Sequence, residues 1–209
     1  MRKTKEEALE TRSRVLKSAM KVFLAKGYSQ TSLTDIAKNA GYTRGAVYWH
    51  FEDKREILEI LISKFHQRFL LKQAEILPSA LDPLQKVSEM ININFLELYR
   101  NKEFRDFIEL TWFKTEIDQH AGLLQGKVAI TKIFNDTITR LFREAAQAGI
   151  LKKELDPEIA ALTITSLING IYRGYFVMPD KLQAEAVGKL IIENYLSQIT
   201  HGRNTNIQN

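Results

Sequence analysis

The stretch from Ser32 to Phe51 reads SLTDIAKNAGYTRGAVYWHF and predicts two short helices joined by a tight turn. Ser32 stands three residues before Asp35, which is a variant of the capping box that opens many helices. Gly41 supplies the positive φ that the turn needs, and the neighbouring alanines let two helix backbones approach closely. Thr43 can cap the second helix, and Asp53, three residues before Glu56, can cap the helix that follows. The stretch therefore predicts a helix-turn-helix.

The second helix of this pair carries more polar and aromatic side chains than a short core helix would, namely Arg44, Tyr48, Trp49 and His50. In DNA-binding helix-turn-helix proteins, the second helix enters the major groove and its N-terminal residues contact base edges. Many pairs of short helices share this geometry. The spacing alone therefore leaves open whether the pair binds DNA or forms an ordinary helical corner.

Positive charge is concentrated in the same part of the chain. The protein has 209 residues and a formal net charge of +5. Residues 1–55 contain 12 Lys and Arg against 6 Asp and Glu, whereas residues 56–209 contain 18 against 19. Phosphate contacts dominate the sequence-independent part of nucleic-acid affinity, so this distribution favours a polyanionic partner for the first quarter alone. The alternative is a solvated basic face that has no partner.

The composition excludes several classes of protein. Its 44% hydrophobic and 26% charged residues are typical of a globular chain. The absence of cysteine excludes a disulfide scaffold, a thiolate zinc site and a cysteine nucleophile. The longest uncharged run, residues 159–172, is shorter than the about 20 residues of a membrane helix, and the charged start is unlike a signal peptide. We therefore expect a cytoplasmic protein with no membrane partner.

Apolar residues recur at helical spacing along almost the whole chain, and no segment alternates as a strand would. We expect an all-α protein of about nine helices. A three-helix helix-turn-helix domain (1–53) precedes a helical body (54–200) and a disordered tail (201–209). The expected helices cover approximately residues 10–26, 33–40, 43–50, 53–69, 82–100, 104–112, 127–148, 156–176 and 182–197.

A family resemblance is carried by Thr11, Arg12, Phe23, Gly27, Thr31, Asp35, Ile36, Ala37, Gly41, Thr43, Gly45, Tyr48, His50, Phe51 and Lys54. With these residues at these spacings, the sequence resembles the DNA-binding domain of the TetR family. The segments RKTKEEALETR and TRGAVYWHF are similar to the AcrR/TtgR branch, whose members repress multidrug efflux genes and are released by small amphipathic drugs. The resemblance implies a homodimeric repressor on a palindromic operator, with a C-terminal ligand-binding and dimerisation domain.

The resemblance and the side-chain chemistry together predict the DNA contacts. Arg44 has the planar donor fork that contacts guanine O6 and N7. Lys54 can contact a phosphate at the start of a helix. Ala46, Val47 and Phe51 are expected in the core. The basic residues Arg2, Lys3 and Lys5 form either a DNA-binding arm or a solvated tail. The expected DNA-binding residues are Thr31, Ser32, Thr43, Arg44, Gly45, Tyr48, Trp49, His50 and Lys54.

For the body, the resemblance implies a ligand chamber between the fourth and eighth helices. Aromatic residues spread over these helices can line a cavity for a flat apolar ligand, although an aromatic residue at helical spacing is more often part of the core. Glu109 and Asn169 can hydrogen-bond a ligand, their own surroundings or water. The expected ligand-binding residues are Phe65, Ile91, Phe95, Ile108, Glu109, Trp112, Phe134, Ile138, Thr165, Ile168 and Asn169.

The apolar residues of the last two helices cover more than one side of each helix. The residues are Leu162, Ile164, Leu167, Ile171 and Tyr175, followed by Val187, Leu190, Ile191 and Tyr195. Such faces predict a homodimer through these helices, and the alternative is a pair buried within its own monomer. The fourth helix, which begins at Lys54 and includes Phe65 and Phe69, is the expected link between ligand and DNA.

An enzyme needs a nucleophile, an acid–base pair or a metal gathered in one place. The four histidines are dispersed along the chain, and the pair Glu116 and His120 at i, i+4 gives only two metal ligands. The sequence has no phosphate-binding loop, nucleophile elbow or HExxH motif. We expect no catalytic residue, cofactor or metal. The remaining alternatives are a regulator of a metabolic operon, as repressor or activator, and a helical adaptor that does not bind DNA.

Overall fold

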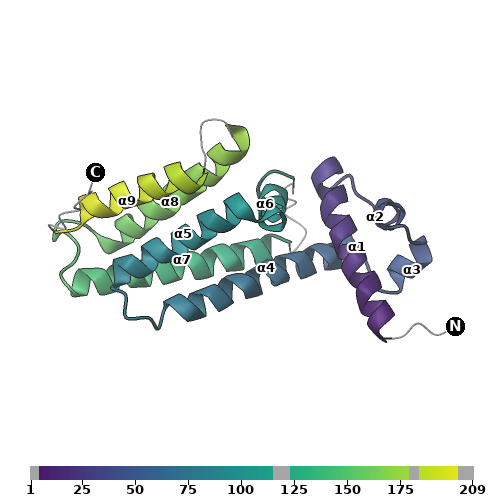
Figure 1. Cartoon of the computed structure of the whole chain (residues 1–209), viewed down its shortest axis with the longest axis horizontal. Coiled ribbons are helices and arrows are strands. Elements are labelled where there is room, and N and C mark those ends of the chain that lie inside the picture. The colour runs from purple at the N-terminus through teal and green to yellow at the C-terminus, as the bar shows by residue number, and fades with distance from the viewer. Residues whose placement is uncertain (1–4, 115–122, 179–183, 202–209) are drawn as a thin grey trace. The chain divides into compact units, whose positions relative to one another are not determined.

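The computed structural model describes residues 5–114, 123–178 and 184–201, with the backbone alone for 123–130 and 184–185. Within these ranges the chain forms nine α-helices, two short π-helical segments and no β-strand, which confirms the predicted all-α class (Figure 1). The elements are α1 (Lys5–Lys26), α2 (Leu33–Ala40), α3 (Arg44–Tyr48), α4 (Lys54–Ile76), α5 (Pro83–Arg100), α6 (Lys102–Glu109), η1 (Leu110–Lys114), α7 (Leu123–Gln147), α8 (Pro157–Val177), η2 (Ala184–Gly188) and α9 (Lys189–Ile199).

The chain divides into two compact units, which we describe separately. The first unit comprises residues 1–68 and 103–129, and its described part includes α1–α3, η1 and the first part of α4. The second unit comprises residues 69–102 and 130–209, with the last part of α4, α5, α8, η2, α9 and most of α7. Because α4 contributes to both units, the domain boundary expected at residue 54 stays a prediction.

In the first unit, α1 packs against α2 and η1, and α2 packs against α3. Val15, Phe23 and Ile36 are fully buried between these helices, so the apolar stripe of α1 forms the centre of the core. Val47 and Phe51 are buried as predicted, whereas Ala46 is only half-buried. The loop after α1 is fixed to η1, because the backbone N–H of residue 28 donates to the carbonyl of residue 114 at 2.9 Å.

The ends of the short helices follow the expected capping chemistry. Ser32 and Asp35 form the capping box of α2, and the helix ends at Gly41 with φ +74°. Thr43 caps α3 by accepting from the N–H of residue 46 at 3.2 Å. Asp53 accepts from the N–H of Glu56 at 2.8 Å in the first turn of α4. Each of these four predictions is confirmed.

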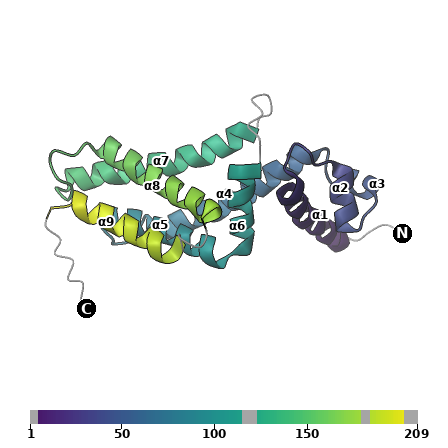
Figure 2. The same cartoon turned by 90° about the horizontal axis from the view of Figure 1, so that it is seen from above.

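In the second unit, α9 packs against both α5 and α8, and these three helices run alongside one another in Figure 1 and Figure 2. Phe95 lies edge-on to Tyr172, with ring centroids 5.7 Å apart. Burial raises the pKa of Tyr172 far above its ordinary value. Gly188 allows a close approach here, because a Cβ at this position would lie 3.0 Å from the Phe95 ring. The Tyr195 hydroxyl donates to the carbonyl of residue 160 at 2.9 Å.

Several helix bounds differ from the expectation. The helix expected over 104–112 ends at residue 109 and continues as the π-helical η1, where the Thr111 hydroxyl lies 2.9 Å from the Phe107 carbonyl. The helix expected over 182–197 includes the π-helical η2 before α9. The helix α7 begins at residue 123, four residues before the expected start at 127. The tail beyond 201 and the pair Glu116 and His120 lie outside the described residues.

In the part of the chain that the structure describes, no helix has both the length and the apolarity to cross a membrane. The same residues contain no cluster of three or more metal-ligating side chains.

Candidate nucleic-acid interface and effector site

The exposed side of α3 and the turn after it carries large aromatic side chains. Trp49 is 72% exposed, and Tyr48 is 45% exposed. Thr43, Arg44 and Gly45 are also exposed at the start of the same helix. Large aromatic side chains open to solvent on a monomer mark an interaction surface. We call residues 43–50 the recognition segment.

Arg44 and Tyr48 form a pair one turn apart on this segment. The Arg44 Nη2 atom donates to the Tyr48 hydroxyl at 3.2 Å, and the guanidinium lies 5.0 Å from the centre of the Tyr48 ring. Gly45 has nothing within 4 Å of the place where a Cβ would stand, so a partner can approach the backbone there. The arrangement presents hydrogen-bond donors and a flat apolar surface side by side, which suits a nucleic-acid groove.

The two residues expected at the start of α2 have different surroundings. Ser32 is exposed at the N-cap, and its hydroxyl donates to Asp35 at 2.6 Å. Thr31 is only 3% exposed, and its hydroxyl donates to the Gly27 carbonyl at 2.7 Å. The structure therefore gives the Thr31 side chain a positioning role in the loop before α2, and its contact with DNA stays a prediction.

Arg12 of α1 holds the end of the recognition segment. Its Nη1 atom donates to the His50 carbonyl at 3.2 Å, and its guanidinium lies 4.8 Å from the centre of the Phe51 ring. It also faces the Glu56 carboxylate of α4 at 3.8 Å. One side chain thus connects α1, the turn after α3 and the first turn of α4. Sequence reasoning found Arg12 only as part of the family pattern and assigned it no site role.

Lys54 joins the first turn of α4 to the loop between α1 and α2. Its Nζ atom donates to the carbonyls of Tyr28 and Ser29, both at 2.9 Å, and lies 4.6 Å from the centre of the Tyr28 ring. Burial lowers the pKa of Lys54. The expected phosphate contact stays a prediction, because in this structure the ammonium is bound to the protein's own loop.

Four of the expected ligand-binding residues belong to the first unit. Phe65 is buried and stacks on Phe107, with ring centroids 4.1 Å apart and an interplanar angle of 17°. Ile108 is buried close by in sequence, while Glu109 and Trp112 are half-buried. Phe65 of α4 thus packs on Phe107 of α6, so the structure equally supports an ordinary core role for Phe65 and Ile108.

The other seven belong to the second unit. Five are buried there as close-packed core side chains, namely Ile91, Phe95, Ile138, Thr165 and Ile168. Phe134 is half-buried and lies 5.6 Å from the Phe69 ring, measured between centroids. Asn169 is exposed on α8, seven residues after the exposed Leu162 and so on the same face, rather than among the buried residues. Asn169 therefore faces away from the core that contains the five buried residues.

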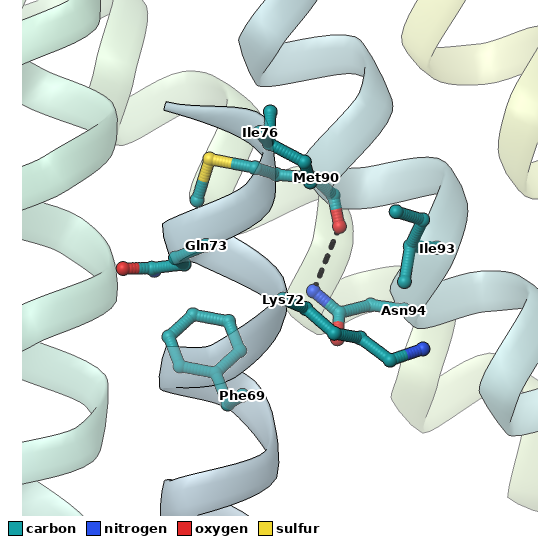
Figure 3. Close-up of a pocket in the computed structure, with 7 residues that line it drawn as sticks. All are labelled: Phe69, Lys72, Gln73, Ile76, Met90, Ile93 and Asn94. Carbon is teal, nitrogen blue, oxygen red and sulfur yellow. Dashed lines mark hydrogen bonds between the residues drawn. The ribbon is translucent and has the colours of Figure 1, made fainter. Parts of the chain in front are cut away.

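A cavity lies between α4 and α5 within the second unit (Figure 3). Its free space has room for about one water molecule. The residues that line it are Phe69, Lys72, Gln73, Ile76, Met90, Ile93 and Asn94. None of these seven residues is among those that the sequence predicts to bind a ligand. Gln73 nevertheless stands out in the sequence, because it is an uncharged polar residue four positions after Phe69 and three before Ile76, and so within an apolar helical stripe.

The apolar faces of α8 and α9 are only partly used within the chain. Ile164, Ile171 and Ile192 are buried. Leu162 and Leu190 are 61% and 57% exposed. Two helices of one unit therefore each leave a large aliphatic side chain in solvent, as expected of a surface that a second copy covers.

Two family profiles match the chain. The profile described as bacterial regulatory proteins of the tetR family matches residues 15–61. The profile described as the C-terminal region of MAATS-type transcriptional repressors matches residues 82–201. Together they cover the helix-turn-helix and most of the helical body.

Known regulatory proteins match this chain over most of its length. The HTH-type transcriptional regulator TtgR of Pseudomonas putida is 33% identical over 184 residues, which are 87% of this chain and 88% of TtgR. The HTH-type transcriptional regulator AcrR of Shigella flexneri is 34% identical, over 93% of this chain and 94% of AcrR.

Among solved structures, the complex of SmeT with triclosan has a TM-score of 0.81 and 27% identity, covering 93% of both chains. A second structure describes SmeT as the repressor of the Stenotrophomonas maltophilia multidrug efflux pump SmeDEF. It has a TM-score of 0.75 and the same identity, covering 92% of this chain and 91% of that one.

Proposed function

Because this chain belongs to the TetR family of bacterial regulatory proteins, we propose that it is a ligand-responsive homodimeric repressor of a multidrug efflux operon. The observation that carries the proposal is the recognition segment, where an Arg44–Tyr48 pair and a largely exposed Trp49 follow a capped helix and a tight turn. A helical adaptor would not need these donors and aromatic rings in solvent on a basic module.

The proposed DNA contacts are the exposed or half-buried residues of this surface. Arg44 reads a guanine edge in the major groove through its two parallel donors. Thr43, Tyr48 and His50 donate to phosphates, while Trp49 packs on sugar or backbone. Gly45 lets the backbone approach, and Ser32 contacts the other side of the groove at the N-terminus of α2. Lys54 and Thr31 act by positioning the loop between α1 and α2, since both side chains bind its carbonyl groups.

Dimerisation is proposed through α8 and α9. The exposed Leu162 and Leu190 support this surface, since burying them in a second copy removes apolar area from water. Two recognition segments related by a two-fold axis then read the half-sites of a palindrome. Their centres are about 34–36 Å apart when they bind successive major grooves.

The proposed effector is a small hydrophobic or amphipathic compound, in line with the triclosan bound by SmeT. Such a ligand weakens DNA binding only if it binds the protein better in a conformation that does not fit the operator. α4 is the proposed link, because it begins at Lys54 and ends beside the cavity at Ile76. Control of efflux genes is inferred from the relatives.

The proposal is tested by selecting random duplex DNA on the purified full-length protein at about 150 mM salt. We expect enrichment of one palindrome, because a two-fold dimer reads two equivalent half-sites. Salt-dependent retention of all DNA without enrichment contradicts sequence-specific repression, since phosphate contacts alone give that behaviour. The enriched operator is then challenged with triclosan, and loss of DNA binding at a concentration that leaves the protein folded is the expected response.

A further inference from the structure

The helix α3 is too short to hold its own direction. It has five residues, Arg44–Tyr48. Isolated helices shorter than about 12–15 residues are marginal in water, so the direction of such a helix is set by contacts outside it. At its N-terminal end α3 is joined to α2 by a tight turn, where the N–H of residue 42 donates to the carbonyl of residue 37 at 3.0 Å. The direction of α3 therefore depends also on what holds its C-terminal end.

Two oppositely charged side chains bind the backbone at that end. Arg12 of α1 donates from Nη1 to the His50 carbonyl at 3.2 Å. Glu56 of α4 accepts from the N–H of residue 52 through Oε2 at 2.7 Å. These two peptide groups are consecutive, and they flank Phe51, which is 1% exposed and whose ring centre lies 4.8 Å from the Arg12 guanidinium. We call Arg12 and Glu56 the clamp.

The attraction between the two charges of the clamp is a secondary effect. The Arg12 Nη2 and Glu56 Oε1 atoms are 3.8 Å apart, and the side chains are 38% and 37% exposed. Ion pairs that are open to solvent contribute little to stability. The specific feature is the hydrogen bonding, because a carbonyl needs a donor and an N–H needs an acceptor. One side chain from α1 and one from α4 thus fix the backbone that directly follows the recognition segment.

We propose that Arg12 and Glu56 are positioning residues that set how strongly the protein prefers its operator to other DNA. They hold the end of α3 so that Arg44 meets a base edge. Without the clamp, the basic surface still attracts phosphates, but the side chain that contacts a base is displaced. Operator affinity then falls while affinity for unrelated DNA is kept. This inference rests on the proposed function, in which the recognition segment reads an operator.

The test measures the operator preference, which is the dissociation constant for a scrambled duplex divided by that for the selected operator. Both duplexes have the same length and base composition, and binding to the full-length protein is followed by fluorescence anisotropy. Arg12→Met and Glu56→Met remove the donor and the acceptor. We expect each to lower the preference about tenfold, as displacement of a base contact does. The double variant should lose little more than either single variant, because both side chains act on one backbone segment.

Two further readouts separate positioning from electrostatics. Glu56→Met removes a negative charge from the basic module, so electrostatic attraction alone predicts tighter operator binding, whereas loss of the clamp predicts weaker binding. Arg12→Met should keep the slope of log affinity against log salt concentration. A phosphate contact made by Arg12 predicts instead a slope smaller by about 0.9 for each subunit, and that result overturns its positioning role.

The conservative variants Arg12→Lys and Glu56→Gln keep a donor and an acceptor at the two positions. Both should retain most of the operator preference, although Glu56→Gln has lost its charge. A preference lost in both conservative variants contradicts the hydrogen-bonding role. Thermal unfolding shows whether each variant is folded at the temperature of the binding measurement, and the conservative variants test the inference where a methionine variant is not.

The matched controls are Arg55→Met and Glu59→Met. These residues are of the same two types and form an ion pair on α4 with 2.8 Å between Nε and Oε1, about half exposed to solvent. Both controls should leave the operator preference unchanged. An equal loss in the controls assigns the effect to charge in general and overturns the inference.

The outcomes also separate this inference from the proposed function. If folded methionine variants have the operator preference of the native protein, the clamp does not position α3, and sequence-specific repression is unaffected. If the native protein itself does not prefer any selected duplex over the scrambled one, the proposed function fails and the inference fails with it.

Discussion

The two units of this protein differ in how their exposed surfaces are held. In the first unit, Arg12, Thr31 and Lys54 each bind backbone carbonyl groups and fix the loops around the recognition segment. In the second unit, Leu162 and Leu190 are exposed on α8 and α9. Hydrogen-bonded loops hold one geometry, whereas an exposed apolar side chain is stabilised by a partner that covers it. The recognition segment is therefore fixed by contacts within its own unit, whereas the exposed leucines are open to a partner.

The largest effect is expected in the second unit, when a charge is placed on the exposed apolar face of α8 and α9. Leu190→Asp should produce monomers, because a carboxylate buried between two copies costs far more than the lost leucine contacts. Operator affinity should fall by more than about 100-fold, since one half-site loses its reader. Light scattering measures the mass. The control Lys153→Gln makes the same charge change on an exposed turn, and a Leu190→Asp protein that stays dimeric rejects the α8–α9 interface.

A smaller effect is expected in the first unit, when the side chain proposed to contact a base is removed. Arg44→Ala should weaken operator binding by about 1–3 kcal/mol and relax the preference at one base pair. Competition binding to a set of single-base operator variants measures both quantities. Arg140→Ala, which removes an exposed arginine from α7, serves as the matched control. Unchanged affinity and preference remove Arg44 from the contact surface.

A substitution of Lys54 tests whether this side chain positions the loop between α1 and α2 or contacts a phosphate of the DNA. Lys54→Met should reduce stability through loss of its two carbonyl contacts, by about 1 kcal/mol given its partial exposure. The salt dependence of operator binding should keep its slope. A phosphate contact predicts instead a slope smaller by about 0.9 for each subunit. Binding measured from low to moderate salt decides between the two roles.

The smallest effect concerns the capping box of α2. The pKa of Asp35 is held well below its ordinary value of 3.8, first by Lys26 and then by Ser32. A lowered pKa in the folded state stabilises the protein above the ordinary value, and this contribution is lost as the pH falls through that value and below. Asp35→Asn should therefore lower the unfolding midpoint at pH 6, and the difference should shrink below about pH 4. A difference that is constant with pH contradicts the ionic role.

Sequence reasoning predicted what depends on neighbours along the chain. The caps at Ser32, Thr43 and Asp53 and the turn at Gly41 rest on residues two to four positions apart, and each is present. The burial of Val47 and Phe51 also follows from local periodicity.

The contacts that single sequences do not reveal are those made across long separations. Arg12 reaches the His50 carbonyl 38 residues away, and Lys54 reaches Tyr28 and Ser29 over 26 and 25 residues. The cavity at Gln73 depends on how α4 and α5 pack, which helical periodicity does not specify. The same packing decides which aromatic residues belong to the core and which line a ligand site.

The exposure of Trp49 has a practical consequence for spectroscopy. The chain has two tryptophans, and the other, Trp112, is half-buried on η1. An indole in water emits at longer wavelength than one inside a protein, so the two residues give separable contributions to the intrinsic fluorescence. A Trp112→Phe variant leaves Trp49 as the sole emitter on the recognition segment. Its quenching then follows operator binding in real time, with no label attached to either partner.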